Sequence, residues 1–390
     1  MSVSFWNDFS TDNQIYSDIA IIGGGIAGLS LAYWLQKEDP NLKVCLIEKG
    51  LLGSGATGRN AGFITCGSVE HFNRLVGTYG EQKALEIWKF SETNLSLLKS
   101  EIFSSLKIED IEFEHNGSFS LASTEKEFEE LKKSAQIMKK LNINVEVLTD
   151  LQILDRLGAE KFVGGIKYQD DASVHPVKLL QAIQSKITNV TFLENNEVFH
   201  IENHGSEKTI LTNKSKITTS AVCYCTNGYS SLLNPYFGDK VFPTRGQILI
   251  TEPVKPFMEG PCYANFVLDY FRQLPSGRII IGGFRQLQKD VELGFSDETS
   301  PIIQSALENF INQHLPMARG KKVTHRWSGV MGFSSDGQPF IGSLPNDPQS
   351  FFNVGFTAHG LGLSFHTSKC LVDLMFGRDI PQFLTAKRLS

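Results

Sequence analysis

The chain has no excess of positive charge, few cysteines and no long apolar run. Its 390 residues carry a formal net charge of -5, which gives no electrostatic case for nucleic acid, although a local basic patch stays compatible with this balance. The six cysteines have no metal-ligand spacing, so we predict no metal site and interpret them as reduced core residues. The uncharged stretch 19–35 is shorter than a bilayer span of about 20 residues and has glycines in its middle. We therefore expect a soluble, cytoplasmic protein with no nucleic-acid partner and no transmembrane segment.

The remaining composition is that of an ordinary globular protein. Hydrophobic residues make up 41% and charged residues 20% of the chain, and no repeat or low-complexity tract interrupts it. A chain of this length suffices for about two or three domains, each with a full hydrophobic core.

A glycine-rich stretch at 18–28 follows the pattern of a dinucleotide-binding turn. A short β-branched run precedes the glycines and a helical pattern follows them, which predicts strand, turn and helix in that order. Gly23 permits the tight turn, Gly25 lets the backbone approach a pyrophosphate, and Gly28 lets the helix pack against the strand. The phosphates would then face the positive end of a helix dipole.

An acidic residue supports this interpretation. The next predicted strand, 44–47, ends at Glu48, where a carboxylate can accept hydrogen bonds from the adenosine ribose. A glycine-bearing turn in an ordinary α/β unit would not require that acid. Two kinds of enzyme remain compatible with these residues alone, a flavin enzyme and a nicotinamide-dependent dehydrogenase.

Further along the chain, segments of different character alternate. The segment 53–63 has four glycines in eleven residues, as a loop in contact with an extended ligand would. Helical spacing predicts helices over 81–107, 125–141 and 301–314, a helix from Pro176, and a helix that follows Gly362 and stops at Gly377. Strands are predicted over 117–122, 190–193, 198–201, 209–212, 215–220, 221–225, 247–251, 267–274, 278–282, 325–329 and 353–356.

Six motifs in order resemble the D-amino-acid-oxidase-like superfamily of FAD-dependent amine oxidoreductases over nearly the whole chain. They are the glycine-rich start with Glu48, the loop 55–62, Val-His-Pro at 174–176, Thr-Arg-Gly-Gln at 244–247, Trp-Ser-Gly at 327–329 with Asp-Gly-Gln-Pro at 336–339, and His-Gly-Leu-Gly at 359–362. Within this superfamily the chain looks most like gamma-glutamylputrescine oxidoreductases and relatives of glycine and sarcosine oxidases.

The resemblance implies an α/β fold with two domains. A Rossmann-like FAD domain would be discontinuous, built from 1–80, 150–232 and 325–390. A substrate domain of α+β type, on a mostly antiparallel sheet, would comprise 81–149 and 233–324.

The resemblance also implies which residues contact FAD. Those expected to hold the ADP portion, the pyrophosphate, the ribityl chain and the flavin ring are Gly23, Gly25, Ile26, Ala27, Gly28, Glu48, Lys49, Thr57, Arg59, Asn60, Ala61, Gly62, Phe63, Val198, Thr226, Gly228, Gly360, Leu361 and Gly362. Backbone amides at the last three would face the pyrimidine side of the flavin, where the reduced ring carries negative charge.

Three positions depart from the pattern of particular relatives. Met331 occupies the place of an arginine that binds the substrate carboxylate in glycine-oxidase-like members, so a simple amino acid would not be held in their way. Arg59 stands where some members have a flavin-linked histidine, and Gly329 lies near the position of a flavin-linked cysteine in others. We therefore expect FAD to be bound noncovalently.

The predicted activity is oxidation of a C–N bond in a small amine or amino acid. The amine would transfer a hydride to flavin N5 and leave an imine, with oxygen or another compound as electron acceptor. Candidate substrates are gamma-glutamyl polyamines, N-substituted amino acids and D-amino acids, and the alternative to an enzyme is an FAD-bound non-catalytic subunit. Arg272 could bind a substrate carboxylate or form a structural ion pair at the end of a strand. Tyr270 could line the pocket or lie in the core. His359 could hydrogen-bond flavin or substrate, or it could be a capping or core histidine.

The remaining conspicuous side chains have no clear chemical partner in the sequence. Trp327 fits a pocket wall and the core equally well. His71, His115, His200 and His204 have no constellation around them, so we assign them to structure or surface.

Overall fold

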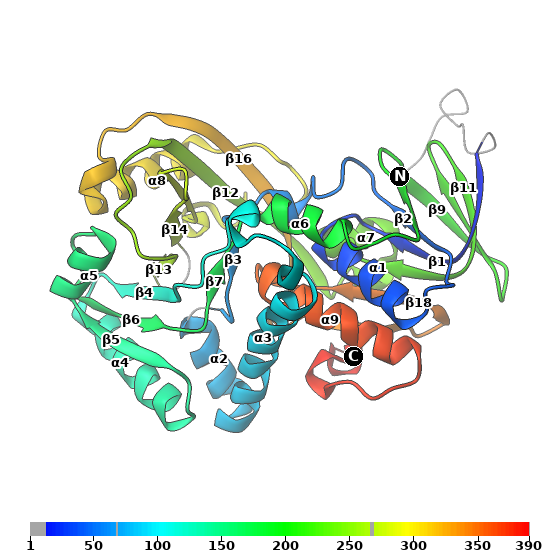
Figure 1. The fold of residues 1–390 in the computed structure, drawn as a ribbon, viewed down its shortest axis with the longest axis horizontal. Helices are drawn as coiled ribbons and strands as arrows, with labels where there is room; N and C mark the ends of the chain where they lie inside the picture. Colours follow the sequence, from blue (N-terminus) through cyan, green and yellow to red (C-terminus); the bar gives the residue numbers. More distant parts are fainter. Residues whose placement is uncertain (1–12, 68, 266–268, 390) are drawn as a thin grey trace.

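Two eight-stranded sheets divide the molecule (Figure 1). The structure is a computed structural model that describes residues 13–67, 69–265 and 269–389. Each sheet has its own helices, and the cavity described below lies where the two halves meet. This arrangement confirms an α/β fold with a second, mostly antiparallel sheet.

The first sheet is assembled from the start, middle and end of the described chain. Its main order is β17-β18-β11-β1-β2-β8, in which neighbours pair in parallel except for β17 and β18. The bounds of its strands are β1 (Gln14–Ile22), β2 (Val44–Ile47), β8 (Val190–Leu193), β9 (Val198–Asn203), β10 (Lys208–Thr212), β11 (Lys216–Tyr224), β17 (Phe340–Leu344) and β18 (Asp347–Val354). Antiparallel β9 and β10 extend it beside the first half of β11. The predicted return of the chain to this sheet at 221–225 is therefore confirmed, and the segment predicted separately over 215–220 belongs to the same strand.

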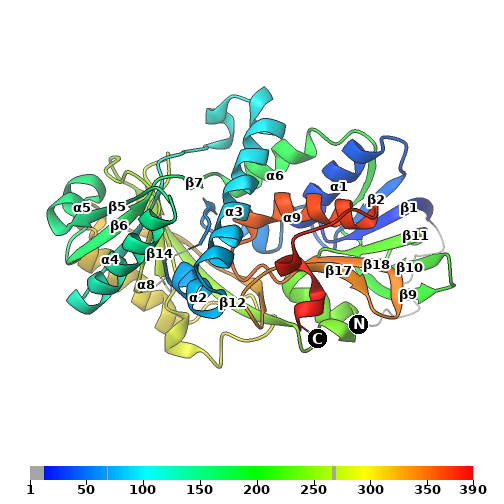
Figure 2. The same cartoon turned by 90° about the horizontal axis from the view of Figure 1, so that it is seen from below.

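Alternate residues of β1 explain how this sheet is covered on both faces. Ile19 and Ile21 belong to the core beneath the helices, whereas Ala20 and Ile22 belong to the core on the opposite face. The helices α1 (Ile26–Glu38), α6 (Pro176–Gln184) and α9 (Gly360–Met375) lie together on one face (Figure 2). Because both faces are buried, the central strands are apolar throughout.

The second sheet has the order β16-β12-β15-β14-β13-β4-β6-β5. Its strands are β4 (Ser118–Ala122), β5 (Val145–Thr149), β6 (Gly164–Tyr168), β12 (Val241–Pro253), β13 (Cys262–Ala264), β14 (Asp269–Gln273), β15 (Arg278–Gly282) and β16 (Val323–Ser334). Only the pair of β13 and β4 is parallel among the described neighbours. Its helices are α4 (Glu125–Lys140), α5 (Asp150–Leu157) and α8 (Pro301–His314).

Short elements and two helices connect the halves. The two-stranded sheet of β3 (Phe63–Ile64) and β7 (Ala172–Ser173) lies between them, and α7 (Ser230–Leu233) follows β11. Helix α3 (Glu81–Glu101) packs beside α9, and α2 (Val69–Tyr79) packs against α3 and borders the cavity. Side chains of α3 hold the start of α9, since Ser91 donates to the carbonyl of Gly362 at 2.7 Å and Asn94 to that of Leu361 at 3.1 Å.

Several element boundaries differ from those predicted. The helix predicted over 81–107 ends at Glu101, because two 3-10 turns, 103–105 and 108–111, follow it, and α2 was not predicted. The strand predicted from 267 begins at Asp269, with 266–268 outside the described residues, as is most of the predicted lead-in 1–16. Both β6 and β16 belong to the second sheet, so the predicted domain boundaries at 150 and 325 do not follow the sheets.

Two further features follow from the packing. All six cysteines are buried and free, which places them in the core. Among the helices of residues 13–67, 69–265 and 269–389, none combines the length and apolar character needed to cross a bilayer.

Candidate active site

A cavity of about 1130 Å³ runs between the two sheets. One part is lined by the turn after β1, the end of β2 and the start of β9, and another by residues of β13, β14 and β16 and by the start of α9. Pockets for single small ligands span roughly 300–1,000 Å³. This cavity therefore has room for an extended ligand and a second, smaller one.

The glycine turn has the close contacts that its sequence predicts. A methyl group on Gly28 would lie 1.9 Å from the carbonyl oxygen of Gly23, so only glycine lets α1 approach β1. Gly23 has φ +109°, a conformation that other residues rarely adopt. Gly25, the residue before α1, has no side chain to fill the space in front of the helix N-terminus, where free backbone amides attract anions.

Glu48 lies at the end of β2 with both carboxylate oxygens fixed. Its Oε2 accepts from the amide of Gly24 at 2.7 Å and its Oε1 from that of Gly50 at 2.8 Å. Lys49 pairs with Glu197 at 2.9 Å, and Val198 at the start of β9 lines the cavity beside them. These contacts orient the acid toward the end of the cavity that would receive an adenosine.

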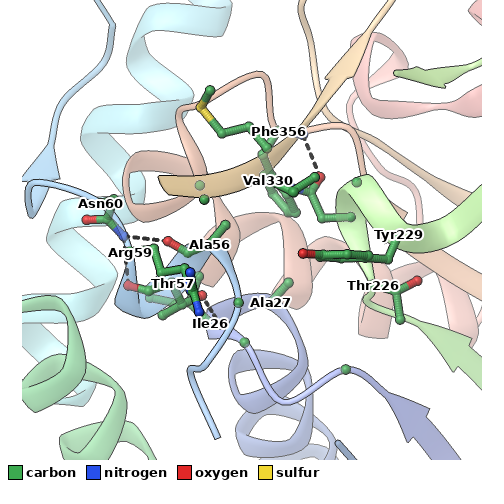
Figure 3. A pocket seen from close by; sticks show the side chains of 18 of the residues that line it. Ile26, Ala27, Ala56, Thr57, Arg59, Asn60, Thr226, Tyr229, Val330 and Phe356 are labelled. Atoms are coloured by element: carbon green, nitrogen blue, oxygen red, sulfur yellow. Dashed lines mark hydrogen bonds between the residues drawn. The ribbon is translucent and has the colours of Figure 1, made fainter. Parts of the chain in front are cut away.

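The loop after β2 is ordered by its own side chains (Figure 3). Thr57 Oγ1 accepts from the amide of Ile26 at 3.0 Å, which links the loop to the first turn of α1. Asn60 Nδ2 donates to the carbonyls of Ala56 and Thr57 at 3.0 and 2.7 Å, while its Oδ1 accepts from the amide of Gly62 at 2.7 Å. The close-up shows this loop on one side of the cavity, with Tyr229 and Thr226 on the other.

Arg59 ties the same loop to β16. Its Nε donates to the carbonyl of Ser54 and its Nη1 to that of Ser328, both at 2.9 Å. In return, Trp327 Nε1 donates to the carbonyl of Arg59 at 3.1 Å. Trp327 therefore fixes the loop from the core side and is absent from the lining residues.

The start of α9 faces the cavity together with the turn after β11. Gly360 and Leu361 line the cavity, and a methyl group on Gly228 would lie 2.8 Å from the carbonyl oxygen of Met331. Thr226 Oγ1 lies 2.9 Å from Ser230 Oγ. The helix start thus directs backbone amides toward the middle of the cavity, where they can stabilise negative charge.

Two histidines and an arginine lie beside this helix start. The rings of His71 and His359 have centroids 5.0 Å apart, and the guanidinium of Arg74 donates to His71 Nδ1 at 3.0 Å. Burial, aided by the nearby Arg74 charge, lowers the pKa of His359 to about 4. Burial likewise holds the pKa of His71 well below its ordinary value. Both imidazoles are therefore neutral near pH 7.

The wall from the second sheet is aromatic and apolar. Tyr270 on β14 lines the cavity, and a methyl group placed on Gly282 would lie 2.4 Å from its hydroxyl, so that glycine makes room for the phenol. A methyl group on Gly246 would lie 2.9 Å from Met331 Cε, which brings Met331 close to the same hydroxyl. Burial raises the pKa of Tyr270 to about 12, so the phenol keeps its proton.

Arg272 does not contact the cavity, which corrects its prediction as a carboxylate ligand. The residue is 2% exposed, and its Nε and Nη2 donate to the carbonyls of Ala61 and Val174, each at 2.8 Å. Glu114 lies 3.9 Å from its Nη1. Strand alternation correctly put Arg272 on the same side as Tyr270, but the two backbone carbonyls draw its guanidinium behind the loop.

Most predicted site residues meet at this cavity. All of them line it except Arg272, Gly28, Gly62 and Gly362. These three glycines pack against backbone, since added methyl groups would lie 1.9–2.2 Å from carbonyl oxygens of Gly23, Val174 and Thr65. They shape the walls rather than face the ligand.

Sequence reasoning missed several lining residues. His71 was assigned to structure or surface, but it lines the cavity, as do Arg74, Tyr263, Arg285 and Phe333. His71 and Arg74 are three positions apart, so they lie on the same face of a helix, and this spacing was the available sequence signal for both. The other three sit on strands or turns whose facing depends on the twist of the second sheet.

Comparison with known proteins identifies the family. Residues 18–374 match the family described as "FAD dependent oxidoreductase". The chain belongs to this family. It is therefore an FAD-dependent oxidoreductase, and the nicotinamide-dependent alternative is not supported.

Individual relatives are distant but span nearly the whole chain. The probable oxidoreductase OrdL of Haemophilus influenzae is 23% identical, with 93% of this chain and 84% of that protein covered. Gamma-glutamylputrescine oxidoreductase of Escherichia coli is 22% identical, with 96% and 88% covered. The crystal structure of glycine oxidase from Geobacillus kaustophilus has a TM-score of 0.80 at 23% identity, with 94% and 96% covered, and shows the same fold.

The lining residues fit FAD. Gly25 leaves the approach to the α1 N-terminus open, Glu48 ends β2 at the adenosine end, and the loop around Asn60 runs from that end toward the start of α9. This set provides a glycine turn, an acid and two helix N-termini in one continuous cavity.

Proposed function

We propose that this chain oxidises a C–N bond of a small amine or amino acid with noncovalently bound FAD. The observation that carries the proposal is the continuity of the cavity between the dinucleotide groove and the wall formed by Tyr270 and Met331. A substrate held against that wall would lie beside the start of α9, at the end of the cavity opposite Glu48. Transfer of a hydride requires that the substrate and the cofactor be in contact within one enclosed space.

Bound FAD supplies flavin N5 as the acceptor of the substrate hydride. The backbone amides at Gly360 and Leu361 stabilise negative charge at the middle of the cavity. The loop around Asn60 excludes water from one side, and the apolar side chains of Phe63 and Met331 do so from another. The imine that remains on the substrate is then hydrolysed by water.

The neutral imidazoles favour an amine that loses its proton. Since His359 carries no charge near pH 7, one of its ring nitrogens can accept a hydrogen bond from the substrate amine, whereas Nδ1 of His71 already accepts from Arg74 and its other ring nitrogen carries the proton. The Arg74 charge close by disfavours a second cation at this place. A substrate with a neutral amine therefore fits better than the ammonium form.

Two features support noncovalent attachment and the choice of substrate class. The guanidinium of Arg59 is engaged with backbone carbonyls, and Gly329 has no side chain to form a bond to the flavin. Relatives in this family include a gamma-glutamylputrescine oxidoreductase and a glycine oxidase, which act on amines by their names. Gamma-glutamyl polyamines, N-substituted amino acids and D-amino acids are the candidates, with oxygen or another acceptor taking the electrons.

The testing experiment is anaerobic mixing of the purified protein with a panel of these amines while the visible flavin band is recorded. Bleaching by one class supports amine oxidation, and readmitting air then distinguishes oxygen from other acceptors. Acid precipitation that releases all flavin into the supernatant supports noncovalent binding. A yellow protein that no amine bleaches would favour the FAD-bound subunit instead.

A further inference from the structure

Arg285 is a cation at the cavity wall without an acidic partner. It begins the 3-10 turn Arg285–Gln288, which follows β15, and it lines the cavity. Its guanidinium carbon lies 4.4 Å from the ring centroid of Phe333, which also lines the cavity. Across residues 13–67, 69–265 and 269–389, no carboxylate lies within ion-pair distance of it and no acceptor is hydrogen-bonded to it.

The side chains of the lysine and the other two arginines at the cavity each have a protein partner. Lys49 pairs with Glu197, Arg59 is bonded to two backbone carbonyls, and Arg74 contacts His71. An arginine has five donors in a planar fork that matches a carboxylate. A half-buried guanidinium with unfilled donors is unfavourable by itself, and an incoming anion would relieve this.

The backbone before Arg285 is held in an unusual conformation. Phe284 has φ +58°, a left-handed conformation that is rare and strained for a bulky residue. Its amide donates to Oδ1 of Asp269 at 2.7 Å, and Asp269 is fully buried and also accepts from Asn265 Nδ2. Asp269 thus fixes the turn that presents Arg285 to the cavity.

The position of Arg285 separates it from the dinucleotide groove. Tyr270, whose electrostatic interaction with Arg285 reflects their proximity, belongs to the wall from the second sheet, as does Phe333 on β16. Glu48 follows β2 of the first sheet, and α1 packs on that sheet. The cation therefore faces the part of the cavity assigned above to the substrate.

We propose that Arg285 binds a carboxylate of the substrate by a hydrogen-bonded ion pair, and that Asp269 positions it. This inference rests on the proposed function and specifies it, because the substrate is then an amine that also carries a carboxylate, not a simple polyamine. The ring of Phe333 contacts the guanidinium by a cation–π interaction, and Tyr270 lines the same part of the cavity.

The test is a titration of the FAD-loaded full chain with acetate and benzoate, and with acetamide and benzamide as uncharged counterparts, read by the flavin absorption spectrum. We expect Arg285→Gln to weaken carboxylate binding about 10- to 100-fold and amide binding less than about 3-fold. Arg285→Lys should recover part of the loss, because it restores the charge without the fork. Asp269→Asn should weaken carboxylates less than Arg285→Gln does, since the amide oxygen can still accept from Phe284.

Arg319→Gln is the matched control, since Arg319 is exposed and away from the cavity. Equal binding of acids and amides to the unmodified protein, or unchanged carboxylate binding in Arg285→Gln, would overturn the inference. Loss of FAD from Arg285→Gln at unchanged thermal stability would also overturn it, because the arginine would then serve the cofactor. The titration needs no turnover, so failure of every amine to bleach the flavin would count against the proposed function alone.

Discussion

Arg272 on β14 donates from Nε to the carbonyl oxygen of Ala61 at 2.8 Å, and this bond links the second sheet to the loop that borders the cavity. A second bond, from Nη2 to the carbonyl of Val174, holds the segment before α6 in the same way. Burial lowers the pKa of this guanidinium to about 10, so it still carries its charge near pH 7. One side chain thereby connects three segments that are far apart in the sequence.

We predict that Arg272→Met lowers the free energy of unfolding by about 2–4 kcal/mol and weakens FAD binding. The reason is that two buried carbonyls lose charge-assisted donors while the loop at Ala61 loses its support. Urea unfolding and flavin titration of the apoprotein measure both effects, and Arg319→Met is the surface control. If the variant instead kept its stability and FAD affinity and had a raised KM, Arg272 would be assigned to substrate binding.

The glycines of the first turn should separate into two classes. Gly28→Ala places a methyl group 1.9 Å from a backbone oxygen, so we expect a loss of about 3 kcal/mol in stability and little folded protein. In Gly25→Ala the nearest atom is Thr57 Oγ1 at 3.0 Å, so the chain should fold and yet lose FAD. Far-UV circular dichroism and the ratio of flavin to protein absorbance distinguish these outcomes.

Gly77→Ala, in α2, is the control for both. An added methyl group there meets no atom within 4 Å, and alanine is favoured over glycine in a helix by up to about 1 kcal/mol. If Gly25→Ala retained full flavin content, close approach of the pyrophosphate to this residue would be contradicted.

Local patterns predicted the first sheet and its nucleotide turn well. The residues 18–28 contain the strand, the turn and the start of the helix in one contiguous stretch, so their mutual geometry is set by short-range sterics. The pairing of β11 with β1 could also be predicted from the sequence, because β11 ends, like β1, as an apolar strand that leads into a glycine-containing turn.

The substrate side could not be predicted in the same way. Arg272 and Arg285 lie in one region of the second sheet, yet the first points behind the loop and the second lines the cavity. The first is held by carbonyls of residues 61 and 174, which are far from it in the sequence, and the second is presented by the left-handed conformation of its neighbour Phe284, which no turn residue signals. The role of His71 was missed for a similar reason, since its partner His359 is far away in the sequence.

Glu48→Ala should weaken FAD binding by about 10- to 100-fold. The carboxylate is expected to accept from the ribose, and hydrogen bonds to a charged group contribute about 1.5–3 kcal/mol each. Flavin fluorescence during titration of the apoprotein gives the dissociation constant. Glu207→Ala, at an exposed position, controls for the loss of one negative charge. Because Glu48 also accepts from Gly24 and Gly50, a small drop in apoprotein stability is expected as well, and equal FAD affinity would contradict the assigned role.

Acidification should destabilise the protein between pH 6.5 and about 4 through His359. Its pKa is about 4 in the folded chain and near the ordinary 6.5 when unfolded, so the unfolded state binds more protons in this window. The stabilisation from neutral His359 is therefore fully present above pH 6.5 and is lost as the pH drops toward 4, by an amount on the order of 3 kcal/mol.

His71 and His366 have lowered pKa values for the same reason, burial, and add to the wild-type slope. The contribution of His359 is the difference between urea unfolding curves of the wild type and His359→Asn at several pH values. The asparagine variant should show a shallower dependence of stability on pH than the wild type. A slope unchanged in His359→Asn would mean that the imidazole accepts its proton in the folded state, and the neutral form invoked for amine binding would then be wrong.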